Sequence, residues 1–220
     1  MAKAPAHSFF RANGLSLTLM VIFLLCLAGQ WLSGWAVWNH ELLQHGRPAI
    51  TLIAYTASAH FFSATFENWE SEFLQMAMYV LLTVWLRQRG SAESRPLDPA
   101  EEHEQIDPGP KPWPLRVGGV WRALYARSLS IALFALFAAA FVGHALGSWS
   151  HENALRSMQG ESPVAFPSFM VDAQFWFESL QNWQSEFLAV LALVVLSIFL
   201  RQDKSPESKP LEAPHAQTGR

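Results

Sequence analysis

Residues 68–74 read Asn-Trp-Glu-Ser-Glu-Phe-Leu, and the stretch returns 114 residues later as Asn-Trp-Gln-Ser-Glu-Phe-Leu at 182–188. The same offset carries the Leu-Arg-Gln at 86–88 onto the Leu-Arg-Gln at 200–202. Self-similarity at one fixed offset is the mark of a duplicated structural unit. The sequence therefore predicts two tandem copies of one unit, with a short gap in one loop that aligns His40-Glu41 with His151-Glu152.

Each predicted copy contains two apolar segments. Residues 15–36 and 128–149 are long enough to cross a hydrocarbon core of roughly 30 Å as helices. The second segments, 73–86 and 187–200, are shorter, and extension back to Trp69 and Trp183 supplies the missing turn. Ser58 and Asp172 are good helix N-caps, which predicts long helices over about 59–88 and 173–202.

These segments predict an all-α membrane protein of four transmembrane helices with pseudo-two-fold symmetry. The two proline-containing polar stretches read as disordered segments on the cytoplasmic side. The predicted organisation is a first repeat at 1–88 (spans 14–37 and 69–88, outer loop 38–68), a linker at 89–114, a second repeat at 115–202 (spans 126–149 and 183–202, outer loop 150–182) and a tail at 203–220.

The basic residues near the predicted spans set the orientation, because cytoplasmic loops are enriched in lysine and arginine. The two loops on the opposite side carry only Arg47 and Arg156. We therefore expect both termini to be cytoplasmic. The basic residues on the cytoplasmic side are Lys3, Arg11, Arg87, Arg89, Arg95, Lys111, Arg116, Arg122, Arg127, Arg201, Lys204 and Lys209.

Residues 1–36 also resemble a secretory signal peptide, with a basic start and an apolar core. Their second copy at 128–149 lies in the middle of the chain, where it can only be a span, so we favour a span for both. The net charge of −3 argues against nucleic acid as a partner. The lipid bilayer is the expected environment, with self-association or a membrane protein as the expected protein contact.

Small residues at four-residue spacing indicate close helix packing in two of the predicted spans. They are Gly29 and Ser33 in the first span and Gly143 and Gly147 in the third. They suit either contacts inside the four-helix bundle, which we favour, or a homodimer through the glycine pair.

A polar set falls inside the predicted spans, where uncompensated carboxylates are costly and indicate function. Its members are Asn68, Glu72, Asn182, Glu186, His144 and Gln30. One hypothesis is a proton or cation path using Glu72, Glu186 and His144. The other, which we favour, is that both glutamates lie at headgroup level and cap or bond neighbouring helices.

No metal, cofactor or catalytic residue is predicted. The outward pairs His40-Glu41 and His151-Glu152 offer ligand atoms without a tight ligand spacing. Phosphate loops, paired-cysteine motifs, zinc-protease motifs and nucleophile elbows are absent from the sequence. An enzyme therefore has no support.

The chain resembles a family of small bacterial membrane proteins known only as a domain of unknown function. The segments that carry this resemblance are 13–17, the Asn-Trp-Glu-Ser-Glu-Phe-Leu region at 66–75, and Leu-Arg-Gln at 86–88 with its Glu-Ser-Arg-Pro tail. The resemblance implies a bacterial inner membrane and supplies no activity. We expect a structural or interaction protein of that membrane, with a small proton- or cation-handling channel or transporter as the alternative.

Overall fold

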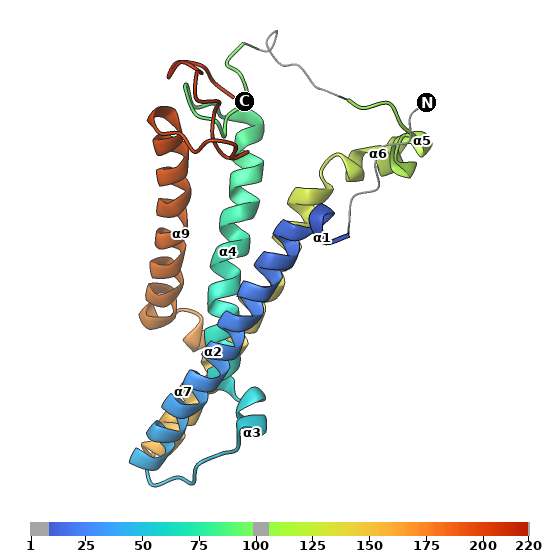
Figure 1. Ribbon diagram of the computed structural model, residues 1–220. Coiled ribbons are helices and arrows are strands. Elements are labelled where there is room, and N and C mark those ends of the chain that lie inside the picture. Colours follow the sequence, from blue (N-terminus) through green and yellow to red (C-terminus); the bar gives the residue numbers. More distant parts are fainter. Residues whose placement is uncertain (1–8, 99–105, 220) are drawn as a thin grey trace. The chain divides into compact units, whose positions relative to one another are not determined.

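The computed structural model describes residues 9–98 and 106–219, and every regular element in this part of the chain is a helix (Figure 1). The predicted all-α class is confirmed for these residues. The four long helices are α2 (Gly14–Gln44), α4 (Ala59–Trp85), α7 (Ser128–Met158) and α9 (Ala173–Phe199). The short helices are α1 (Phe9–Ala12), α3 (Leu52–Thr56), α5 (Trp113–Val117), α6 (Gly119–Tyr125) and α8 (Phe166–Phe169).

Three of the long helices, α2, α7 and α9, are long and apolar enough to cross a membrane. Helix α4 is long enough to cross a membrane, but it is less apolar than these three helices. It carries Glu67, Glu70 and Glu72 near its middle, and carboxylates are costly to bury in lipid. The fourth predicted span is therefore a prediction that composition alone does not support.

The helix ends follow local capping rules. Asp172 accepts a hydrogen bond from the backbone N–H of Gln174 at 2.7 Å, and α9 starts at the next residue, where the sequence predicted a helix. Helices α2 and α7 both end before a glycine with positive φ, Gly46 at 68° and Gly160 at 76°. Glycine stops helices in this way because it adopts the left-handed conformation without steric cost.

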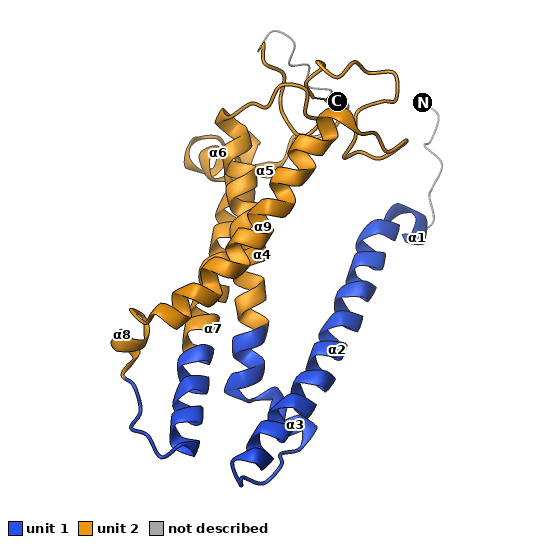
Figure 2. Ribbon diagram, turned by 90° about the vertical axis from the view of Figure 1, so that its left-hand side faces the viewer, with its two compact units in different colours: residues 1–64, 147–164 blue, residues 65–146, 165–220 orange. Residues whose placement is uncertain are grey.

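The chain divides into two compact units, shown in Figure 2. Unit 1 comprises residues 1–64 and 147–164, and unit 2 comprises residues 65–146 and 165–220. The boundary falls within α4 and within α7, so each of these helices contributes residues to both units.

Unit 1 holds its loops against the ends of α2 and α7 by two matching sets of hydrogen bonds. The Trp35 indole N–H donates to the carbonyl of Ile50 at 2.8 Å, and the Asn39 amide both donates to and accepts from the Ile50 backbone. Trp149 and Asn153 make the same three bonds to Val164.

These bonds run at an offset of 114 straight through the loop, without the gap predicted from the sequence. The gap aligned His40-Glu41 with His151-Glu152, whereas the hydrogen-bond pattern places His40 opposite Ala154. The predicted gap was wrong because it was placed to align two His-Glu pairs, and the hydrogen bonds of the loops do not follow that alignment. A tryptophan and an asparagine one helical turn apart define the register instead.

Unit 2 includes the ends of the predicted linker and tail, where the described residues make hydrogen bonds. Lys209 is 2% exposed, and its ammonium donates to the carbonyls of Pro214, His215 and Gln217. The N–H of Gly219 donates to the carbonyl of Ser91, which is fully buried. The three hydrogen bonds of the Lys209 ammonium hold this proline-containing stretch in one conformation. The acidic part of the linker at 99–105 lies outside the described residues.

Candidate functional site

A buried acid–base pair links α4 to α7 within unit 2. Nδ1 of His144 lies 3.0 Å from Oε2 of Glu70, and both side chains are 0% exposed. A carboxylate buried in this way is stable only when it is paired and hydrogen-bonded. The pair therefore fixes the two helices against each other at one register.

Helix α9 completes the arrangement around Glu70. The indole N–H of Trp183 donates to Oε1 of Glu70 at 3.0 Å, so both carboxylate oxygens are occupied. The ring of Phe175 lies against the imidazole of His144, with 5.1 Å between centroids. We call Glu70, His144 and Trp183 the Glu70 network, and it joins three of the four long helices through polar atoms with aromatic surroundings.

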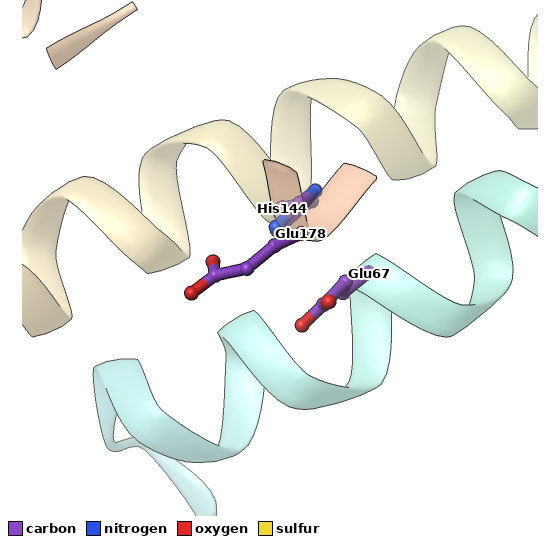
Figure 3. A group of neighbouring side chains, drawn as sticks. All are labelled: Glu67, His144 and Glu178. Atoms are coloured by element: carbon purple, nitrogen blue, oxygen red, sulfur yellow. The ribbon is translucent and has the colours of Figure 1, made fainter. Parts of the chain in front are cut away.

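A second layer of polar groups lies beside the Glu70 network. The amide of Asn182 donates to Oε1 of Glu67 at 2.6 Å, and Gln174 donates to Oε1 of Glu178 at 2.8 Å. Glu67, His144 and Glu178 each offer one ligand atom, and these atoms lie within 4.8 Å of one another. Figure 3 shows the three side chains converging from α4, α7 and α9.

The local sequence explains why α7 brings His144 here. Ala140, His144 and Ser148 lie at four-residue spacing on one helical face, and all three are buried. Gly143 beside them faces Phe66 so closely that a β-carbon would lie 2.7 Å from its ring. Small residues around a single imidazole let the neighbouring helix approach it.

The structure brings together only part of the predicted polar set. His144 and Asn182 belong to the site, whereas Glu72 and Asn68 are exposed and Glu186 is half-buried. Gln30 lies in the residues of unit 1. The hypothesis of a proton or cation path grouped His144 with Glu72 and Glu186, whereas the glutamate that contacts His144 in the structure is Glu70. Side chains two positions apart on a helix point in directions that differ by about 200°. Glu70 and Glu72 therefore face nearly opposite sides of α4.

The predicted packing residues divide in the same way. A β-carbon on Gly147 would lie 2.8 Å from the backbone nitrogen of Ser63, so this glycine is required by contact with α4 in unit 1. A β-carbon on Gly29 would meet nothing within 4 Å, and the hydroxyl of Ser33 donates to the Gly29 carbonyl of its own helix.

Sequence reasoning missed Glu67, Glu70, Glu178 and Trp183. A comparison of the two predicted copies could have indicated some of these residues. At the offset of 114, Glu67 and Glu70 correspond to Gln181 and Gln184, and His144 corresponds to Gln30. Positions at which one predicted copy has a neutral amide and the other has a titratable group would have indicated these residues.

Unit 1 contains a separate cluster of aromatic rings and histidines. His60 stacks on Trp38 with 5.3 Å between centroids and contacts the ring of His151 at 5.2 Å. The Tyr55 hydroxyl lies 2.8 Å from Nδ1 of His60. Burial lowers the pKa of His60 against a smaller opposing effect of Glu41, and burial raises the pKa of Tyr55. Both shifts favour neutral side chains, as expected for a packing cluster.

Comparison with known proteins gives a family without an assigned activity. The family described as a domain of unknown function, DUF6766, matches residues 6–220. No curated protein and no solved structure matches the chain. The expected likeness to an uncharacterised family is confirmed.

Proposed function

Because the chain belongs to the DUF6766 family, we propose its function from its own geometry: a structural or interaction module of the bacterial inner membrane. The proposed module consists of four spans in two tandem two-helix repeats, with both termini in the cytoplasm. Its expected contacts are the lipid bilayer and either a second copy or another membrane protein.

The equal geometry of α4 and α9 supports α4 as the fourth span. Both helices have 27 residues, and the bounds of α9 lie 114 residues after those of α4. The buried residues of α4 include Glu70, Ser71 and Gln75, so much of its polar surface is turned toward protein. Polar side chains that face protein rather than lipid are the usual solution within membranes.

Matching contacts at the other ends of these helices support the repeat and the orientation. Arg87 donates to the carbonyls of Thr83, Val84 and Leu86, and Arg201 donates to those of Ser197, Ile198 and Leu200. An arginine that satisfies the last carbonyls of a helix suits the end of a span. Both arginines lie on the side that is rich in basic residues, which we assign to the cytoplasm.

The observation that carries the structural role is the Glu70 network. Oε2 of its carboxylate contacts Nδ1 of His144 in α7, Oε1 accepts from the indole of Trp183 in α9, and the side chains of Glu70 and His144 are both 0% exposed. A buried pair whose two carboxylate oxygens are both hydrogen-bonded, with aromatic surroundings, holds helices in one arrangement and offers a poor route for ions. This arrangement favours a rigid module over a channel.

The test is a flux assay on purified protein in liposomes, with proton- and cation-sensitive dyes. We expect the wild-type protein and its Glu70→Gln variant to match empty liposomes for protons, Na⁺ and K⁺. Flux above that background in the wild-type protein, reduced in Glu70→Gln, would contradict the structural role.

One observation favours the second candidate function, proton or cation transfer. Nε2 of the buried His144 has no hydrogen-bond partner, so the imidazole has a free position for a proton or a cation. The path first expected through Glu72 and Glu186 would then run through Glu70, His144 and Glu67 instead. The same flux assay decides between the two functions.

A further inference from the structure

The cluster of Glu67, His144 and Glu178 has the composition of a metal site. It combines one imidazole with two carboxylates from three different helices, and one ligand atom of each lies within 4.8 Å of the others (Figure 3). His144 is fully buried, and the two glutamates are half-buried. Imidazole and carboxylate together suit first-row divalent ions such as Zn²⁺ and Mn²⁺.

The two nitrogens of His144 have different surroundings, and the difference points to a ligand. Nδ1 is held by Glu70 at 3.0 Å, whereas Nε2 is buried without a hydrogen-bond partner. A buried polar atom without a partner costs free energy. Metal-binding histidines show this division: one nitrogen binds the ion, and the other donates its N–H to a carboxylate that orients the ring.

The charges of the site favour a divalent cation. Three acidic side chains, those of Glu67, Glu70 and Glu178, surround one imidazole, so carboxyl groups outnumber the basic group at the site. Asn182 and Gln174 each donate to Oε1 of one glutamate. Because these bonds occupy Oε1, the oxygen of each glutamate that would bind the ion is Oε2.

We propose that Glu67, Glu178 and Nε2 of His144 bind one divalent transition-metal ion, with Glu70 as the residue that orients the imidazole. Ligand atoms around a tetrahedral Zn²⁺ are about 3.4 Å apart, given bonds of about 2.1 Å. The ligand atoms of the cluster lie within 4.8 Å of one another, so the two half-buried carboxylates need only a small movement to bind one ion. Three protein ligands leave a fourth position for water or a further ligand.

The repeat predicts a single ion per chain. At the offset of 114, the three ligands correspond to Gln181, Gln30 and Ala64, none of which is a good ligand for Zn²⁺. The site would thus belong to one copy only. It is independent of the proposed structural role, because a rigid module and a transporter would each be compatible with a bound ion.

The experiment measures Zn²⁺ binding by isothermal titration calorimetry on the full chain, purified in detergent and stripped with a chelator. We expect one Zn²⁺ per wild-type chain, at least tenfold weaker binding in Glu178→Gln, and no binding at this site in Glu67→Gln/Glu178→Gln. Glu161→Gln is the matched control, because Glu161 is an exposed loop carboxylate that pairs with Arg156. Its affinity should equal that of the wild type. Mn²⁺ and Mg²⁺ titrations define the preference among ions.

Two results would overturn the proposal: no Zn²⁺ binding to the wild type, or equal affinity in the wild type and the double variant. Circular dichroism checks that the variants fold. Should the double variant fail to fold, Co²⁺ added to the wild type provides a second measurement. We expect an intensified visible absorption from Co²⁺ bound at low coordination number, and a spectrum identical to that of aqueous Co²⁺ would reject the site.

Discussion

Helices α4 and α9 have the same length, and their bounds lie 114 residues apart, yet they carry different chemistry. At corresponding positions α4 has Glu67 and Glu70, and α9 has Gln181 and Gln184. Amides suffice for a helix of this kind, so its length and register do not require the acids. In α4, Glu70 instead pairs with His144, and Glu67 accepts a hydrogen bond from Asn182.

The largest expected effect comes from removal of the acid that distinguishes α4. Glu70→Ala leaves His144 and Trp183 without their partner in a buried position and should destabilise the protein by about 3–5 kcal/mol. Gln184→Ala, the corresponding change in α9, alters an exposed side chain and should cost less than about 0.5 kcal/mol. Thermal unfolding in detergent measures both.

A double variant sharpens the same comparison. Glu70→Gln/His144→Gln installs the amides found at Gln184 and Gln30, and it should be more stable than Glu70→Gln alone by about 1–3 kcal/mol. Additive destabilisation of the two single changes would show that the pair does not interact.

The next effect compares the glycines of α7 with those of α2. Gly147→Ala forces a β-carbon against the backbone of Ser63 and should cost about 1–3 kcal/mol. Gly29→Ala meets nothing within 4 Å and should be neutral or stabilising by up to about 1 kcal/mol, because alanine is the better helix former. Equal melting temperatures for the two variants would reject the contact at Gly147.

A smaller effect tests whether the two loops are equivalent. Asn39→Ala and Asn153→Ala each remove the side chain that binds both polar groups of one loop residue, Ile50 or Val164. Each should lower stability by about 1–2 kcal/mol. Amide hydrogen exchange at Ile50 and Val164 should rise only in the variant of its own loop.

The smallest effect concerns the histidine cluster of unit 1. Burial lowers the pKa of His60, with Glu41 opposing, so the folded protein binds a proton there less readily than the unfolded chain, whose pKa is about 6.5. The contribution of His60 to stability is complete above that pH and falls as the pH drops below it. His60 faces the Tyr55 hydroxyl, His151 and Trp38.

Melting temperatures of the wild type and His60→Gln between pH 7.5 and 5 measure this contribution. The wild type should lose more stability on acidification, by up to about 1.4 kcal/mol per pH unit for one proton. His45→Gln removes an exposed histidine and should follow the wild-type curve. Parallel curves for the wild type and His60→Gln would show that His60 does not titrate with folding.

The prediction of the helices succeeded because their causes are local. Apolar runs, Asp172 before α9 and the glycines after α2 and α7 act within a turn or two of the chain. The predicted polar site stays a prediction. Its members were chosen by their polarity and their depth along each helix, which can be counted from the sequence, whereas the contact of His144 with Glu70 depends on the direction of each side chain, which cannot.

The sequence alone predicted an all-helical chain with four spans and a repeated pattern at one offset, and three of the helices in the described residues are long and apolar enough to cross a membrane. Hydrophobicity and capping act on neighbouring residues, so they can be read from order along the chain. The tertiary structure decided which carboxylate meets the imidazole of His144 and how Lys209 organises the tail. These contacts depend on the rotation of each helix about its axis and on chain segments far apart in sequence, which only packing fixes.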